Sequence, residues 1–251
     1  DPSGTSAPPM YLPPASTLVS ILDPCDIPPQ IAPLPPSLGY MEGESFDSGL
    51  GSGGIFGREV VYDFATMTRA YFNYEGKIGG LVASFGGAIY AGPLWGFEWK
   101  HEYTVSDKIQ IEKDYKGLFE GLYIGVSTGL LTVGVGGGIG YFHSPDGNVG
   151  GIFDYVSAGI GLLPGEIVSF RTVYKYEKNN GVRYYADSNG KVNLGSLVGD
   201  ILSGDGSPTN MGGYFCSAIG SQRAGAVSAA LTQAAIYEAY TKWAIENASG
   251  Q

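Results

Sequence analysis

Basic residues are scarce in this chain of 251 residues. Lysine and arginine together number 14, against 24 aspartates and glutamates, so the formal net charge is −10. Because phosphate contacts require a basic surface, this balance excludes nucleic acid as an expected partner. It also disfavours docking on anionic lipid by charge alone. No lysine or arginine precedes Arg58.

Cysteine and histidine each occur only twice. Cys25 and Cys216 cannot build a disulfide-dense scaffold or a zinc site of four thiolates, but they can form one bridge or none. His101 lacks the second histidine that a metalloprotease helix places four residues further on, and His143 lies beside a turn sequence. Both histidines are therefore weak catalytic candidates unless the fold brings them together. The sequence indicates no cofactor and no metal site, and it leans against an enzyme without deciding the question.

Proline is scarce outside the first 36 residues, which hold 11 of the 15 prolines. A proline-rich stretch forms neither a helix nor a central strand, so this segment is predicted to be an extended arm. The next residues, up to 57, are rich in glycine and serine and predict a spacer in which Glu42 and Glu44 are solvated. The predicted organisation is an arm and spacer over 1–57, a barrel-like domain over 58–200, and a connection and C-terminal helix over 201–251 that packs on the barrel.

Glycine, by contrast, is abundant at 41 residues, about twice the usual share of roughly 7 %. Between residues 58 and 200, runs of β-branched and aromatic residues are separated by turn sequences such as Ser144–Asn148 and Ser188–Gly190. Because long helical periodicity is absent here, sequential antiparallel hairpins are expected rather than parallel crossovers. The predicted fold is mainly β: an antiparallel, glycine-rich coiled sheet or closed β-barrel, with one C-terminal α-helix and the extended N-terminal arm.

Two predicted strands show how the glycines alternate with apolar residues. Every second residue from Gly134 to Gly140 is glycine. A face without side chains is tolerated where a sheet bends sharply or where another element approaches closely. On the preceding strand, the aliphatic face is expected to be buried in a soluble barrel; it comprises Leu122, Ile124 and Val126.

The residues from 217 to 247 predict the one clear helix, because they are dense in alanine and carry apolar residues at helical spacing. Leu231 is expected to be buried against the sheet. A cluster of aromatic residues in the strand region is a candidate rim for a ligand cavity or an interface, although such a group also commonly caps a barrel. The cluster comprises Tyr90, Trp95, Phe97, Trp99 and Tyr103.

The stretch from Gly121 to Phe142 contains 22 residues without a charge. That length can span a bilayer as a helix, and its glycines fall at the spacing that lets membrane helices approach closely. The same stretch has many glycines and strand-like alternation. A membrane helix and a membrane-inserted barrel therefore stay open as alternatives to a soluble barrel.

Two groups of residues resemble a known bacterial family. Asp1-Pro-Ser-Gly4 resembles the motif that closes the core of rearrangement-hotspot (RHS) repeat proteins. Four later segments resemble a domain found after that core, and the glycine-rich run to about Pro164 continues the likeness. These segments are Glu59–Thr66, Arg69–Tyr74, Gly79–Gly92 and Trp95–Glu98.

The RHS resemblance implies the variable C-terminal region of a large exported protein, secreted or on the bacterial cell surface. In that family the region is often a toxin, released by self-cleavage from a shell of repeats. The family's cleavage motif continues with leucine where this chain has Thr5, so self-cleavage is not carried over, and neither is a toxin's catalytic motif.

The first functional prediction is therefore a non-enzymatic effector or interaction domain of an RHS-type exported protein. Its partner would be another protein or the parent RHS shell. A membrane is a possible partner that the sequence does not favour. The alternatives are a membrane-active, pore-forming toxin that inserts residues 121–142, and a hydrolytic toxin that uses His101 or His143. In an exported protein, a Cys25–Cys216 disulfide would fasten the arm to the body; two unrelated thiols are the alternative.

Overall fold

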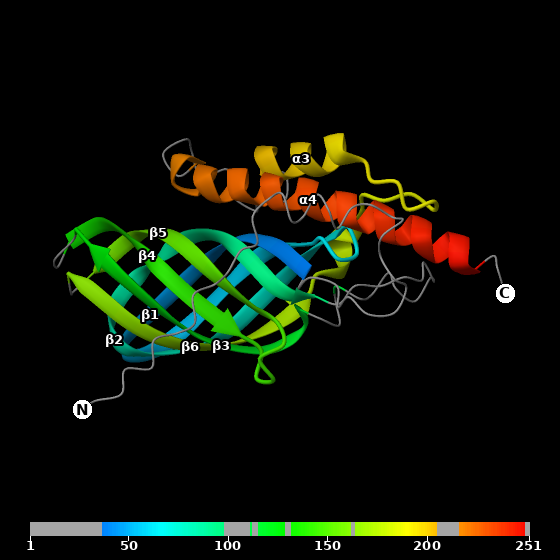
Figure 1. Cartoon of the computed structure of the whole chain (residues 1–251). Helices are drawn as coiled ribbons and strands as arrows, with labels where there is room; N and C mark the ends of the chain where they lie inside the picture. Colours follow the sequence, from blue (N-terminus) through cyan, green and yellow to red (C-terminus); the bar gives the residue numbers. More distant parts are fainter. Residues whose placement is uncertain are drawn as a thin grey trace, which may run out of the picture. The chain divides into compact units, whose positions relative to one another are not determined.

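The computed structural model describes residues 37–97, 111, 115–128, 132–161, 164–204 and 216–248. This part of the chain contains a β-barrel with two helices on its flank (Figure 1). The main strands are β1 (Ser37–Asp63), β2 (Thr68–Phe97), β3 (Gly117–Ser127), β4 (Thr132–His143), β5 (Gly150–Gly161) and β6 (Gly165–Tyr176). The remaining elements are the 3-10 helix η2 (Lys178–Asn180), the short strand β7 (Arg183–Tyr184), and the helices α3 (Leu194–Ser203) and α4 (Cys216–Ala248).

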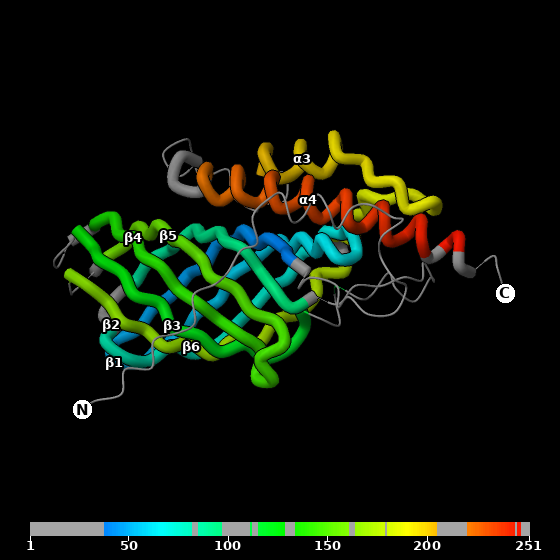
Figure 2. The backbone as a smooth tube through the Cα atoms, in the orientation of Figure 1, coloured from blue at the N-terminus to red at the C-terminus, as the bar shows by residue number. Residues whose placement is uncertain are grey.

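The sheet closes on itself through β2. Its strand order is β1-β2-β5-β4-β3-β6, every pairing is antiparallel, and β6 also pairs with β2. The first half of β2, Phe72–Leu81, pairs with β6, and the second half, Ser84–Trp95, pairs with β5. The strands therefore wind obliquely around one interior (Figure 2). The predicted closed antiparallel barrel with a C-terminal helix is confirmed.

The predicted Gly/Ser-rich spacer is wrong in the part that the structure describes, because residues 37–57 form most of β1. The glycines let β1 fold back on itself. A Cβ atom on Gly53 would meet the Ser48 carbonyl, and one on Gly57 would meet the Glu44 carbonyl. The two halves of β1 therefore lie against each other, an approach that side chains would obstruct. The predicted arm, residues 1–36, lies outside the described residues.

The two ends of the barrel differ. At one end, which we call the tip, β1 bends at Gly49–Gly53, β2 changes its neighbour between Leu81 and Ser84, and β3 and β5 lead into β4 and β6. The predicted turn Ser144–Asn148 lies at the other end, between β4 and β5. The helix α3 was not predicted: it begins in the stretch 58–200 assigned to the barrel and ends in the connection that starts at 201. The Asn193 side chain accepts a hydrogen bond from the Ser196 amide and so caps this helix.

The helices α3 and α4 pack together on the flank of the barrel away from the tip (Figure 1). Leu197 and Ile201 of α3 and Ala230 of α4 are buried against Tyr40 and Tyr62 of β1. Ion pairs fasten both helices to the barrel. Arg69 of β2 lies 3.1 Å from Asp200 of α3, and Arg223 of α4 contacts Glu42 of β1. Glu42, which was expected to be solvated, is therefore buried and paired.

The prediction that Leu231 is buried is wrong, since its exposed fraction is 46 %. Small residues form the buried face of α4 instead, because the helix lies close to the sheet: Ala226, Ala230 and Ala234 are buried there.

This orientation of α4 is testable with two neighbouring substitutions. Ala230→Leu should lower the free energy of unfolding by about 1 to 3 kcal/mol, because a larger side chain must be forced against the sheet. Leu231→Ala should change it by less than about 0.5 kcal/mol, as is usual at exposed positions. Urea unfolding of both variants checks the prediction. Equal effects, or a larger effect at Leu231, would mean that α4 packs through another face.

Candidate functional site

A fully buried carboxylate lies inside the barrel. Glu59 of β1 has no exposed surface. Its Oε2 accepts hydrogen bonds from the Tyr90 hydroxyl at 2.7 Å and from the Tyr174 hydroxyl at 3.4 Å. Among the described residues, its second oxygen, Oε1, has no hydrogen-bond partner. A buried carboxylate with one unpaired oxygen is costly, so it points to a proton, a water molecule or a ligand at that position.

The pKa of Glu59 reflects this environment. Burial raises the pKa to about 7, and the hydroxyls of Tyr115, Tyr90 and Tyr174 lower it in part. The Tyr115 hydroxyl also points at Met41 Sδ, 3.6 Å away. A carboxyl with this pKa changes its charge near neutral pH.

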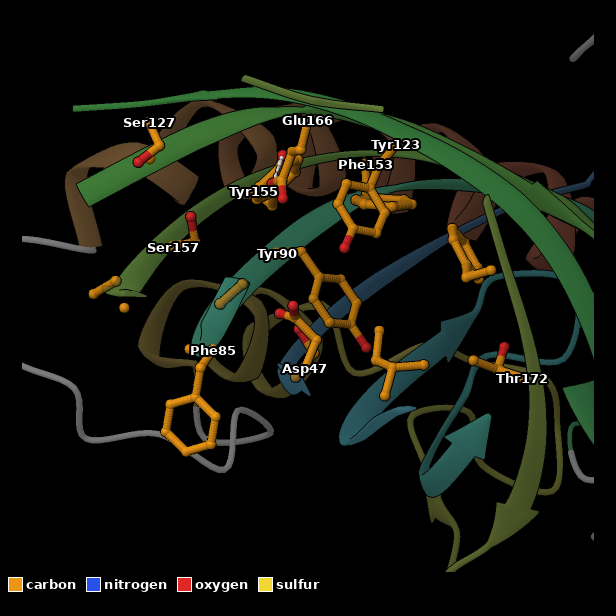
Figure 3. Close-up of a pocket in the computed structure, with 18 of the residues that line it drawn as sticks. Asp47, Phe85, Tyr90, Tyr123, Ser127, Phe153, Tyr155, Ser157, Glu166 and Thr172 are labelled. Carbon is orange, nitrogen blue, oxygen red and sulfur yellow. Dashed lines mark hydrogen bonds between the residues drawn. The ribbon is translucent and has the colours of Figure 1, made fainter. Parts of the chain in front are cut away.

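Glu59 lines a cavity of about 100 Å³ that reaches along the interior to Asp47, Ser157 and Glu166. Figure 3 shows Tyr90, Tyr123 and Tyr155 projecting from the walls into this space. The lining contains three carboxylates, those of Asp47, Glu59 and Glu166, and no lysine or arginine. The interior is therefore lined mainly by apolar and aromatic side chains, and its charged groups are all acidic.

The glycines make room for these aromatic side chains. A Cβ atom on Gly125 would meet the Tyr155 hydroxyl, one on Gly43 would meet the Tyr90 hydroxyl, and one on Gly140 would meet the Phe153 ring. The sequence left two explanations for the glycine faces of β3 and β4, a sharp bend or a close approach, and at Gly125 and Gly140 the structure shows a close approach. The approaching groups are rings from neighbouring strands.

Glu166 is the acid at the tip side of the cavity. Its Oε1 accepts a hydrogen bond from the Tyr155 hydroxyl at 2.7 Å. Burial raises the pKa of Glu166, the Tyr155 hydroxyl lowers it, and the nearby Asp47 carboxylate raises it. Glu59 and Glu166 therefore favour a proton or a cation in the same interior.

The residues predicted for catalysis are not brought together in the described part of the chain. His143 ends β4, where its Nδ1 lies 2.7 Å from the Ser144 carbonyl oxygen and its ring stacks on Tyr141. His101 lies outside the described residues, so a site formed by the two histidines stays a prediction. Among the described residues, no group of three or more His, Cys, Asp or Glu side chains could hold a metal ion.

The predicted aromatic cluster is divided in the part that the structure describes. Tyr90 points into the cavity, whereas Trp95 is 36 % exposed near Gly150. Trp99 and Tyr103 lie outside the described residues, and the side chain of Phe97 is not described. Cys25 also lies outside them, so the Cys25–Cys216 disulfide stays a prediction.

One motif was missed at the sequence level. Gly125-Val-Ser-Thr-Gly129 matches the Gly-x-Ser-x-Gly pattern of a serine nucleophile. That pattern acts at a sharp turn from a strand into a helix, whereas Ser127 ends β3 of an antiparallel hairpin. The described histidine, His143, pairs with Glu120 at the opposite end of that hairpin. His143 is therefore too far along the hairpin to act as a base for Ser127.

The outer surface of the barrel is apolar around the tip. All six main strands contribute aliphatic or phenylalanine side chains whose exposed fractions run from 45 % for Ile160 to 76 % for Leu50. Some of these side chains adjoin directly: Ile124 is the cross-strand partner of Ile167 and of the similarly exposed Ile139, and Phe85 is that of Ile160. We call this set the collar: Leu50, Phe56, Leu81, Phe85, Ile124, Val126, Val135, Ile160 and Ile167.

The collar corrects the prediction for the aliphatic face of β3. Ile124 and Val126 point outward and are 49 % and 72 % exposed, whereas Phe119 and Tyr123 on the alternate face are buried. The barrel is thus apolar outside and polar inside near its tip. The alternation correctly separated the residues of β3 into two faces, but the face predicted to point inward points outward.

On the outer surface of β2, β3 and β6, charged residues stop at a similar distance from the tip. Lys77, Arg171 and Glu120 lie four to seven residues from the tip ends of their strands and pair directly across β2, β6 and β3. An ion pair of 2.9 Å joins Arg171 to Glu120. Towards the tip, four segments contain no Asp, Glu, Lys or Arg: residues 48–57, 78–97, 121–142 and 155–165.

Comparisons with known proteins give no family for this chain: no family model matches it, and no curated protein is similar enough to count as a match. Within the residues that the structure describes, no helix has both the length and the hydropathy needed to cross a membrane. The stretch 121–142, one candidate for such a helix, contains strands β3 and β4 instead.

Proposed function

We propose that this domain is a non-enzymatic effector that inserts the tip of its barrel into a lipid bilayer. The observation that carries the proposal is the collar, which has members on all six main strands and is bounded by charged residues on β2, β3 and β6. Exposed apolar surface of this extent marks an interaction site rather than ordinary solvent-facing surface. This reverses the ranking that the sequence favoured, in which a membrane came second to a protein partner.

A bilayer accounts for the closed shape of the collar. A single protein partner needs an apolar patch on one side, whereas lipid surrounds an inserted object on every side. The uncharged turns support the same proposal, since turns exposed to water are normally polar. The sequence that joins β3 to β4 includes Leu130 and Leu131, and the sequence that joins β5 to β6 includes Leu162 and Leu163.

The charged residues limit the depth of insertion. Four to seven residues at roughly 3.3 Å each give about 13 to 23 Å along a strand, and strand tilt shortens this along the barrel axis. A hydrocarbon core is about 30 Å thick, so the tip would reach through about one leaflet. Lys77, Arg171 and Glu120 would then lie among the lipid headgroups.

The proposal is insertion and not conduction through the barrel. Four aromatic rings fill the interior beyond Glu59, on the side away from the tip, and all four are buried. Their centroids lie 5.0 to 6.3 Å apart in successive contacts. These residues are Phe72, Tyr115, Phe119 and Phe142. Vesicles that bind the domain should therefore retain an entrapped dye.

The RHS resemblance gives this proposal a delivery route. A C-terminal region that is exported within a shell would meet a target membrane only after its release. The parent RHS shell would compete with the membrane for the collar, so the proposal is tested with the domain in the absence of the shell.

One matched pair of variants tests the proposal by vesicle flotation. Ile167→Asp places a charge in the collar on β6 and should weaken binding to uncharged phosphatidylethanolamine–phosphatidylcholine vesicles by roughly tenfold or more. Val173→Asp lies on the same strand, is 40 % exposed, and lies beyond Arg171 as seen from the tip. Its binding should stay within about twofold of the wild type.

Binding should also survive high salt, because it rests on apolar contact, and it should weaken as anionic lipid is added, because the chain carries a net charge of −10. The proposal is overturned if the wild-type protein does not float with vesicles, or if both aspartate variants bind as well as the wild type. Release of an entrapped dye by the wild type would instead favour a pore.

A further inference from the structure

The cavity inside the barrel has two polar atoms without partners among the described residues. One is Oε1 of Glu59 and the other is Oγ1 of Thr172 on β6. Both residues are buried, with exposed fractions of 0 % and 1 %, and both line the same cavity. Native interiors leave few polar atoms unpaired, and each one that remains calls for an explanation, such as a water molecule, an ion or a ligand at that position.

Three tyrosine rings line the same cavity as the unpaired carboxylate oxygen. The rings of Tyr74 and Tyr174 are stacked with their centroids 4.8 Å apart, and the Tyr74 and Tyr90 centroids are 6.4 Å apart. The hydroxyls of Tyr90 and Tyr174 hold Oε2 of Glu59, and the Tyr115 hydroxyl also faces the carboxylate, so the carboxylate is fixed in place. A counter-charge among aromatic rings is the combination by which proteins hold ammonium groups.

Charge and size restrict the ligand further. The cavity lining carries carboxylates and no basic residue, so an anion would be repelled. Its volume of about 100 Å³ is below the roughly 300 Å³ at which drug-sized ligand sites begin. It is comparable with a cavity of roughly 150 Å³ that admits benzene. The ligand is therefore a cation with few heavy atoms.

We infer that the interior of the barrel is a binding site for a small alkylammonium ion. The ion lies against Oε1 of Glu59, which supplies the opposite charge, and the rings of Tyr74, Tyr90 and Tyr174 surround its alkyl groups. The inference does not rest on the proposed insertion of the tip, because it concerns the interior and not the collar.

The test uses the whole chain in an alkyl maltoside, an uncharged detergent without an ammonium group. Choline chloride is titrated by calorimetry at about pH 8, where Glu59 is largely ionised. The neutral compound 3,3-dimethylbutan-1-ol has nearly the same shape and serves as the comparison. Choline should bind, and the neutral compound should bind roughly tenfold more weakly or not at all. Sodium chloride at equal ionic strength should give no comparable heat.

Two glutamate variants locate the site. Glu59→Gln should weaken choline binding by roughly tenfold or more, whereas Glu120→Gln, which removes a carboxylate on the outer surface, should leave it within about twofold. Circular dichroism confirms that each variant is folded. If Glu59→Gln does not fold, the site is located in the wild-type protein instead. Nuclear Overhauser effects should then connect the choline methyl protons to tyrosine ring protons.

The inference is overturned if choline gives no binding, if the neutral compound binds equally well, if folded Glu59→Gln binds as the wild type does, or if no contact to tyrosine rings is seen. None of these results bears on vesicle binding, so failure here is distinct from failure of the proposed insertion.

Discussion

Replacing Arg223 with methionine should lower the free energy of unfolding by about 3 to 5 kcal/mol. The guanidinium of Arg223 holds Glu42 through two contacts, Nε to Oε2 at 2.9 Å and Nη2 to Oε1 at 2.5 Å. Glu42 is only 2 % exposed, so losing Arg223 would leave a buried carboxylate without its counter-charge. Urea unfolding near neutral pH measures the loss.

The double variant Arg223→Met, Glu42→Gln is the control, since it removes both charges. It should be more stable than Arg223→Met alone, because a neutral amide beside the Tyr40 hydroxyl costs less than an unpaired carboxylate. Exposed ion pairs contribute less than about 1 kcal/mol. If Arg223→Met lowers the free energy of unfolding by no more than that, the result would contradict a buried ion pair between Arg223 of α4 and Glu42 of β1.

Glu59→Gln should remove a pH dependence of about 3 kcal/mol from the stability of the protein. The pKa of Glu59 is raised from an ordinary value of 4.5 to about 7 by burial. The folded state therefore keeps a proton that the unfolded chain loses, and wild-type stability falls as pH rises through this window. The titratable groups that face Glu59 are the hydroxyls of Tyr90, Tyr115 and Tyr174, whose pKa values burial raises well above 10.

The measurement is the difference in unfolding free energy between wild type and Glu59→Gln from pH 4 to pH 8. Other carboxyls with raised pKa values, Glu44 and Glu166, contribute equally to both proteins and cancel. Between about pH 4.5 and 7, the unfolding free energy of Glu59→Gln should rise relative to that of the wild type. Outside that range, the difference between the two proteins should stay constant. Parallel curves throughout would show that Glu59 is ionised and solvated.

Part of the strand order followed from local signals, whereas the sequence left an open coiled sheet and a closed barrel as alternatives. Short β-rich segments, marked turns and the absence of helical periodicity predict sequential antiparallel hairpins, and β3–β4 and β4–β5 are such hairpins. The prediction is wrong for β6, which pairs with β3 and β2 instead of with β5. The folded-back β1 was missed because Gly49–Gly53 reads as a flexible spacer. Its strand character comes from pairing with β2, a tertiary effect that outweighs local propensity.

The two sides of the barrel could not be assigned from alternation alone. A period of two shows that Ile124 and Val126 share a face and that Tyr123 lies on the other. Choosing the inner face then relied on the rule that apolar residues avoid water, which presupposes water outside. Glu59 was overlooked for a related reason: a single acid in a strand normally faces solvent, and only the fold shows that its neighbours are Tyr90 and Tyr174.

The matching of glycines to rings couples positions that are far apart in the sequence. The Tyr155 hydroxyl occupies the space that a Cβ atom of residue 125 would need, and the Tyr74 hydroxyl does the same at residue 57. Each ring therefore fits only while its partner position is glycine. A substitution at one member of a glycine–tyrosine pair is therefore tolerated only with a compensating substitution at the other. These pairs set the interior width of the barrel. Replacing both members of a pair together would widen or narrow the interior without altering the strands.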